Sequence, residues 1–123
     1  MNSRGQAILP LLIIIIIVLS LGVTTLELAI NEIVIDRYFH DEMTSFYTTE
    51  AALENGFLRI LRNPSYLGED LQINGASCRI EVSGGSPNVI SAGCNNNRQV
   101  RKMRGEVSFV GGKMTITNIK EIE

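Results

Sequence analysis

The chain has 123 residues, a formal net charge of −2 and a hydrophobic content of 45%. This length allows one small domain beside a membrane segment and excludes a second domain. The charge is uneven: residues 27–62 hold seven acidic and three basic residues, a balance of −4, whereas residues 98–113 hold five basic and one acidic, a balance of +4.

The first predicted element is a membrane span at residues 7–26, which contain no charged side chain. Twenty helical residues are about 30 Å long, the thickness of a hydrocarbon core. Glu27 marks the far edge, because an acidic residue near the bilayer centre costs about 3 kcal/mol. Arg4 precedes the span and acidic residues follow it, so the N-terminus is expected in the cytoplasm and the rest outside. A conventional cleaved signal peptide fits less well, since the apolar run is too long and no small-x-small site follows it.

The helix is expected to continue beyond the membrane. Apolar residues recur at spacings of three and four, and Glu50 interrupts the pattern. Asn63-Pro64 predicts the end of the helix, because a residue that precedes proline is disfavoured in the helical conformation. A helix over residues 6–62 would be about 80 Å long, far longer than ordinary globular helices. The apolar positions are Phe39, Met43, Phe46, Leu53, Phe57 and Ile60.

After Tyr66 the pattern changes to two-residue alternation, which predicts an extracytoplasmic antiparallel β-domain of about four strands at residues 66–123. Asn74-Gly75 and Gly111-Gly112 predict two hairpins. The sheet would have one apolar face, and the helical stripe from Phe46 to Ile60 is its natural cover. The predicted fold class is therefore α+β, with one long N-terminal helix packed on a small antiparallel sheet. The predicted cross-strand pairs are Leu71 with Cys78, Ile73 with Ala76, Phe109 with Met114 and Val107 with Ile116.

Cys78 and Cys94 are predicted to form a disulfide. A three-residue turn at Gly85-Ser86-Pro87 would pair Val82 with Ile90 and set the two cysteines opposite each other. Both lie in the part expected outside, where disulfides persist, and the closed loop would contribute about 3 kcal/mol. A zinc site would need two more ligands nearby, so no metal and no cofactor are expected.

Two motifs resemble type IV pilins. Ser3-Arg4-Gly5, followed by Gln6 and an apolar run, resembles the leader of prepilins, which a membrane peptidase cuts after the glycine. The resemblance implies a leader at residues 1–5 and a mature chain of 118 residues (123 − 5) that begins at Gln6. The stretch SFYTTEAAL at residues 45–53 is similar to the A-F-x-A-A-E-A-A-L segment of PilX-type minor pilins. Its matching residues are Phe46, Glu50, Ala51, Ala52 and Leu53.

One departure from the pilin pattern lies near the predicted mature N-terminus. Major pilins carry a glutamate at the fifth mature position, where this chain has Pro10, and Gln6 replaces the usual aromatic first residue. The chain therefore resembles the minor or tip-located pilins that lack this glutamate.

The expected function is that of a minor type IV pilin-like structural subunit, held in the membrane before assembly into a pilus or pseudopilus. The expected partners are the membrane, the prepilin peptidase and other pilin subunits, which would contact the N-terminal helix. The β-domain would be displayed for adhesion, assembly priming or DNA uptake. The alternative is a permanent single-pass membrane protein with a small extracytoplasmic binding domain, as a sensor or accessory subunit. No enzyme and no small-molecule substrate are expected, because the sequence offers no nucleophile-base pair or phosphate-binding glycine loop.

Two charged features have open interpretations. Arg98, Arg101, Lys102 and Arg104 would bind DNA phosphates or an acidic neighbouring helix, but the lack of interleaved aromatic residues favours a solvated loop or strand edge. Glu27 either makes a subunit contact or simply ends the span.

A third charged feature is the run His40, Asp41 and Glu42. These adjacent residues point in different directions on a helix, which predicts a solvated face rather than a metal or acid-base site.

Overall fold

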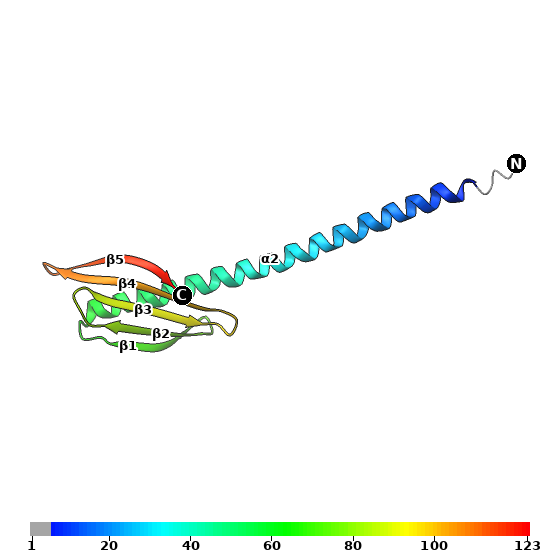
Figure 1. Cartoon of the computed structure of the whole chain (residues 1–123). Helices are drawn as coiled ribbons and strands as arrows, with labels where there is room; N and C mark the ends of the chain where they lie inside the picture. The colour runs from blue at the N-terminus through cyan, green and yellow to red at the C-terminus, as the bar shows by residue number, and fades with distance from the viewer. Residues whose placement is uncertain (1–5) are drawn as a thin grey trace. The chain divides into compact units, whose positions relative to one another are not determined.

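The computed structural model describes residues 6–123. One long helix, α2 (Ile8–Arg62), is followed by five strands that form one antiparallel sheet in the order β1-β2-β3-β4-β5 (Figure 1). The chain divides into two compact units, the helix up to Phe39 and residues 40–123. The predicted α+β class is confirmed, although the sheet has five strands rather than about four. The strands are β1 (Gly68–Ile73), β2 (Ala76–Ser83), β3 (Asn88–Asn95), β4 (Val100–Val110) and β5 (Lys113–Ile122).

The helix ends at Arg62, as the following Asn63-Pro64 predicts. The amide of Asn63 still donates a hydrogen bond of 2.9 Å to the carbonyl of Arg59, which closes the last turn. Arg59 and Arg62 lie in that turn, where their positive charges interact favourably with the negative end of the helix dipole. Pro10 lies in the first turn, where its missing N–H leaves no helical hydrogen bond unmade.

The core of residues 40–123 forms between one face of α2 and one face of the sheet. The helical stripe packs as predicted at Leu53, Phe57 and Ile60, which are at most 6% exposed, whereas Phe46 is half-buried and Met43 is exposed. The sheet contributes alternate residues of its three central strands, because successive side chains of a strand point to opposite faces. These buried sheet residues are Ala76, Cys78, Ile80, Ile90, Ala92, Cys94, Met103 and Val107.

Two glycines allow the helix to approach the sheet closely. A Cβ atom on Gly105 of β4 would lie 2.5 Å from Cζ of Phe57, and one on Gly56 of α2 would lie 3.0 Å from the side chain of Ile80. The first distance is shorter than carbon atoms tolerate, so glycine is required at Gly105 for the ring of Phe57 to fit against β4. The second is tight, and a side chain at Gly56 would require Ile80 to move by a few tenths of an ångström.

The helix also buries polar residues that the apolar stripe does not predict, namely Ser45, Thr48 and Thr49. The hydroxyls of Thr48 and Thr49 donate hydrogen bonds of 2.7 and 2.8 Å to the carbonyls four residues earlier. Such bonds within the helix satisfy both hydroxyls and let these side chains pack beneath the sheet.

The predicted strand register is confirmed at every pair named above, including Leu71 with Cys78 and Phe109 with Met114. Both hairpin turns have positive φ angles at their two central residues, as type I′ turns require: Asn74 at 50°, Gly75 at 78°, Gly111 at 59° and Gly112 at 76°. The pairing of β4 with β5 contains one irregularity, a β-bulge between Arg104 and Glu106. Asn118 on the facing strand has a positive φ of 53°.

Cys78 of β2 and Cys94 of β3 form the predicted disulfide, with their Cα atoms 4.1 Å apart. The two residues are a direct cross-strand pair, and each is 2% exposed. The bridge therefore lies inside the core, on the face of the sheet that the helix covers.

Candidate functional site

The helix up to Phe39 presents apolar side chains to its surroundings along its whole length. Every described residue from Gln6 to Phe39 is exposed in the isolated chain. Among residues 6–123, α2 is the one helix with a stretch long and apolar enough to cross a membrane, and this stretch lies near the N-terminus. The finding is compatible with a single membrane span.

The apolar surface continues beyond the predicted span. At 100° per residue, the large apolar side chains of residues 28–39 lie on about two thirds of the helix circumference, and the remaining third carries Glu32 and Asp36. An apolar surface of this width is normally covered by other apolar groups. These side chains are each 44–68% exposed and comprise Leu28, Ile30, Ile33, Val34, Ile35, Tyr38 and Phe39.

Gly5 and Gln6 are the residues at the predicted leader cleavage site, and Glu27 is the residue predicted to end the span. Gly5 lies outside the described residues, and Gln6 is the first described residue and is exposed. Glu27 is exposed on the helix and has no ion-pair partner among residues 6–123.

The pilin-like motif at residues 45–53 divides between two faces of α2. Ala52 and Leu53 lie in the core at 0% and 2% exposure, whereas Glu50 and Ala51 point away from it and are exposed. Phe46 is half-buried at the edge of the core. Half of the motif therefore serves packing inside the domain, and Glu50 is available on the surface.

The structure divides the predicted basic cluster of Arg98, Arg101, Lys102 and Arg104. Arg98 donates a hydrogen bond of 2.8 Å to Asp41, and Arg101 donates one of 2.7 Å to Glu42 on the same helix. The prediction of a solvated loop or strand edge is therefore wrong for Arg101, which lies on β4, a strand with neighbours on both sides, and has its side chain only 18% exposed.

His40 and Glu42 are exposed, as the predicted solvated face requires, whereas Asp41 is half-buried. The two carboxylates also accept hydrogen bonds from Arg98 and Arg101, which the sequence did not predict. The distant sequence positions could not reveal these contacts, since they form only when the helix covers the sheet.

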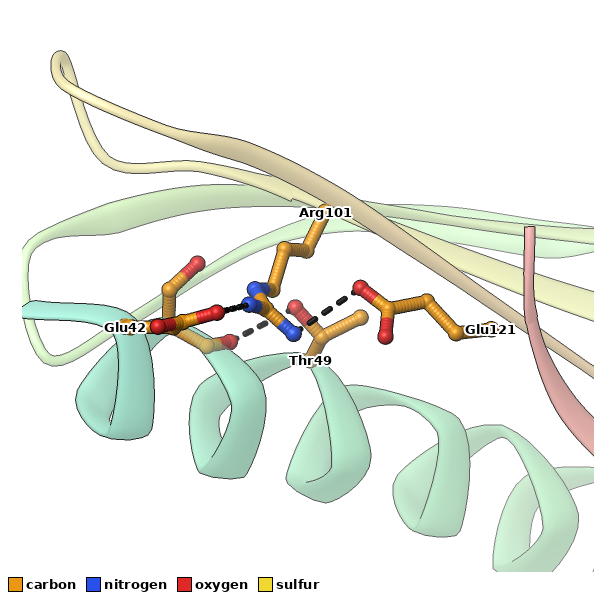
Figure 2. Close-up of polar contacts among 5 residues, drawn as sticks. Glu42, Thr49, Arg101 and Glu121 are labelled. Atoms are coloured by element: carbon orange, nitrogen blue, oxygen red, sulfur yellow. Dashed lines mark hydrogen bonds and ion pairs between the residues drawn. The ribbon is translucent and has the colours of Figure 1, made fainter. Parts of the chain in front are cut away.

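Arg101 joins three elements of the domain (Figure 2). Its side chain extends from β4 toward α2 and lies between Glu42 on the helix and Glu121 on β5, to which it donates a second hydrogen bond of 2.9 Å. Each carboxylate is about half exposed, at 57% and 49%, while the guanidinium is largely buried. Hydrogen bonds between charged groups are stronger than neutral ones, so Arg101 fixes the last strand to the helix.

Replacing Arg101 with leucine is expected to lower the free energy of unfolding of residues 40–123 by about 1–2 kcal/mol, because two half-exposed ion pairs are lost. The matched control is Arg98→Leu, whose guanidinium is 76% exposed and should contribute less than about 0.5 kcal/mol. Pulse proteolysis of the full-length protein in detergent with increasing urea measures both variants. Equal effects of the two substitutions would contradict the assignment of Arg101 as the joining residue.

Lys102 and Arg104 lie on the opposite face of the sheet, which the helix does not cover. They alternate along β4 with Arg101 and Met103, which face the helix. Lys120 of β5 is the direct cross-strand partner of Arg104 and therefore shares its face. Sequence reasoning missed Lys120, because the unbroken register of the hairpin would set Ile119 opposite Arg104. The β-bulge moves this pairing by one residue.

A second polar cluster lies where the helix is followed by β1. Nε of Arg59 is 3.2 Å from a carboxylate oxygen of Glu69. That oxygen and the hydroxyl of Tyr66 are both buried, and neither makes a hydrogen bond of good geometry within residues 6–123. Burial of the phenol and, after it, the nearby carboxylate of Glu69 raise the pKa of Tyr66 to about 12.

In an ultraviolet titration of the folded protein, Tyr66 is therefore expected to ionise at a pH about two units higher than a free phenol. The folded state holds this proton more tightly than the unfolded state. Its contribution to stability is complete below pH 10 and is lost as the pH rises to about 12. Tyr66→Phe should remove the ionisation near pH 12, and Tyr47→Phe should retain it. If Tyr47→Phe removed this ionisation and Tyr66→Phe did not, the raised pKa would not belong to Tyr66.

The exposed face of the sheet also carries an ion pair between Asp70 and Arg79, with hydrogen bonds of 2.8 and 3.2 Å. The hydrogen bonds from Arg79 hold the pKa of Asp70 below its usual value. Among residues 6–123, no group of three or more His, Cys, Asp or Glu side chains is arranged to hold a metal ion. Two kinds of surface stand out among the described residues: the apolar helix, and the charged faces of residues 40–123.

Comparisons with known proteins identify no relative: no family model, no curated protein and no solved structure matches the chain.

Proposed function

We propose that this chain is a minor type IV pilin-like structural subunit, anchored in the membrane by residues 7–26 before it enters a pilus or pseudopilus. The leader-like Ser3-Arg4-Gly5 and the pilin-like motif at residues 45–53 motivate the proposal. The subunit would present its β-domain outside the membrane, for adhesion, assembly priming or DNA uptake.

The observation that carries the proposal is the apolar surface of residues 28–39. If residues 7–26 cross the hydrocarbon core, a headgroup layer of about 5–7 Å covers only about four further residues. Ile33, Val34, Ile35 and Phe39 then lie beyond the lipid, although each is at least 44% exposed. Covering such a side chain contributes about 1.5–3 kcal/mol. Neighbouring helices in a filament would cover the apolar two thirds of this segment and leave the side with Glu32 and Asp36 to solvent.

The permanent single-pass alternative is favoured by Pro10, which stands where major pilins carry their assembly glutamate. This alternative leaves the apolar residues beyond the span without cover unless another membrane protein surrounds them. The minor pilins that the chain resembles also lack this glutamate, so Pro10 does not exclude a filament subunit, which accounts for the apolar residues beyond the span.

The test is N-terminal sequencing and intact mass of the native protein from membrane and sheared surface fractions, without reducing agent. A chain that starts at Gln6, retains its disulfide and occurs in the sheared fraction supports the proposal. A chain that retains Arg4-Gly5 and stays in the membrane overturns it and supports the permanent single-pass protein.

A variant tests whether residues 28–39 mediate assembly. Val34→Gln places a polar side chain in the apolar surface and should lower the amount in the sheared fraction by about tenfold while membrane insertion is unchanged. Arg37→Gln, a change at a neighbouring position that is already polar, is the control. Equal recovery of both variants from the sheared fraction would show that this segment does not mediate assembly.

A further inference from the structure

Residues 40–123 carry acidic and basic groups on opposite sides of the domain. On α2, Glu50 and Glu54 are one turn apart and exposed, Glu54 on the side that faces away from the sheet and Glu50 on the flank beside it. Neither carboxylate forms an ion pair within residues 6–123. Tyr47 and Leu58 flank them and are 59% and 52% exposed. This surface, called the acidic helix face below, combines two negative charges with two apolar side chains.

The other side of the domain is the outer face of the sheet, where Lys102, Arg104 and Lys120 lie close together. Arg104 and Lys120 are directly opposite on β4 and β5, and Lys102 is two residues from Arg104 on the same face. Like charges directly opposite on neighbouring strands destabilise a sheet. These three residues are called the basic sheet face.

The neighbouring carboxylates neutralise the basic sheet face only in part. Glu106 lies 3.8 Å from Arg104 and also accepts a hydrogen bond of 3.0 Å from Asn118. Lys102 and Lys120 form no ion pair within the described part of the chain. The outer face is therefore a surface on which an added carboxylate would relieve repulsion.

The two faces match in charge and spacing. Side chains one helical turn apart have Cβ atoms about 5–6 Å apart. Directly opposed residues on neighbouring strands have Cβ atoms about 4.5–5.5 Å apart. Glu50 and Glu54 can therefore meet Arg104 and Lys120 as two parallel ion pairs. Since the faces lie on opposite sides of the domain, one chain cannot satisfy this contact within itself.

We propose that the basic sheet face binds the acidic helix face of a second copy of this chain. The contact joins two different surfaces, so each copy retains one free face of each kind and the interaction can be repeated from copy to copy. It rests on the proposed role as a filament subunit and names the surfaces through which neighbouring domains recognise each other. A nucleic acid is the less favoured partner, because no aromatic side chain accompanies Lys102, Arg104 and Lys120 on this face to stack on bases.

The test is zero-length crosslinking of the full-length protein in native membranes and in sheared surface material. A carbodiimide joins a carboxylate to a lysine amine, with loss of water, only where the two groups touch. Two differently tagged copies are co-expressed, one is captured, and crosslinked peptides are identified by mass spectrometry. The expected result is a bond between copies that joins Glu50 or Glu54 to Lys102 or Lys120.

Charge reversal provides the matched variants. Lys102→Glu with Lys120→Glu should lower the yield of crosslinked dimer by about tenfold, because it removes both reactive amines and sets like charges against each other. Combining these changes with Glu50→Lys and Glu54→Lys should restore the dimer with the residue types exchanged. Recovery of the dimer in the exchanged variant therefore distinguishes a contact between the faces from simple loss of the amines. Lys113→Glu, an exposed lysine at the hairpin turn, is the control and should leave the yield unchanged.

Three results would overturn the inference: no bond between these residues, bonds only to a different protein, or retention of the dimer in the reversed variant. The outcome is separate from that of the proposed function. A chain that begins at Gln6 and enters sheared filaments without this crosslink would support the proposed function and contradict the inference. An unprocessed chain that stays in the membrane and still forms the crosslink would contradict the proposed function and support the inference.

Discussion

Replacing Leu53 with alanine is expected to lower the free energy of unfolding of residues 40–123 by about 3 kcal/mol, as is typical for a buried leucine. Leu53 is 2% exposed and lies in the pilin-like motif, where it packs between α2 and the sheet. A domain of this size has only about 5 kcal/mol of stability, so the variant should be close to unfolding at 37 °C.

The matched control is Leu58→Ala, which makes the same chemical change on the same helix. Leu58 is 52% exposed, and its truncation should change stability by less than about 0.5 kcal/mol. Hydrogen exchange of the β2 and β3 amides in the detergent-solubilised protein reports the unfolding of the domain without interference from the membrane part of the helix. Equal exchange in the two variants would show that the helix does not cover the sheet as described.

Loss of the disulfide is the second large effect. Replacing both Cys78 and Cys94 with alanine should lower the free energy of unfolding by about 3 kcal/mol, because the bridge closes a loop with a sequence separation of 16. Both side chains are buried, so alanine is preferred to serine, whose hydroxyl would lack a partner in the core.

Reduction of the native protein provides an independent measurement of the same bridge. A reductant should lower the urea midpoint of the native protein in pulse proteolysis and leave the double-alanine variant unchanged. A midpoint of the native protein that is insensitive to reduction would contradict a structural role for the bridge. The pH should be kept constant in both measurements, because thiolate chemistry depends on it.

Most of the sheet could be predicted from local sequence. Asn74-Gly75 and Gly111-Gly112 each specify a two-residue turn, and a turn of fixed length determines the pairs that follow it as far as the next bulge. The apolar alternation then selects the face that the helix covers. The end of α2 was equally predictable, because Pro64 determines the conformation of the residue before it.

The charged contacts were not predictable, because they depend on tertiary packing. Asp41 and Glu42 are far from Arg98 and Arg101 in sequence, and only the packing of α2 on the sheet brings them together. The burial of Thr49 also had no signal in the sequence, since its hydroxyl is satisfied by the carbonyl of Ser45 within the helix.

The β-bulge was the third feature without a sequence signal. The extra residue lies on β5, where Asn118 and Ile119 are both opposite Gly105, and a single asparagine within the alternating pattern does not by itself indicate a bulge. Without the bulge, the two-residue alternation of β5 would continue from Ile116 through Asn118 to Lys120, and all three would face the helix. With it, Lys120 is opposite Arg104 on the outer face, and Glu121 reaches Arg101 on the inner face.

The extra residue of β5 marks the one place in this strand where its length can change. Thr117 and Lys120 are opposite Glu106 and Arg104, so loss of Asn118 would keep Lys120 on the outer face and Glu121 on the inner face. Loss of a residue between Gly112 and Ile116 would instead move Ile116 to the outer face and set a threonine opposite the buried Val107. Substitutions at the exposed residues Thr115 and Thr117 would be tolerated, because they leave every other residue on its own face. In relatives of this protein, we therefore expect deletions in this strand at residues 118–119 and not between Gly112 and Ile116.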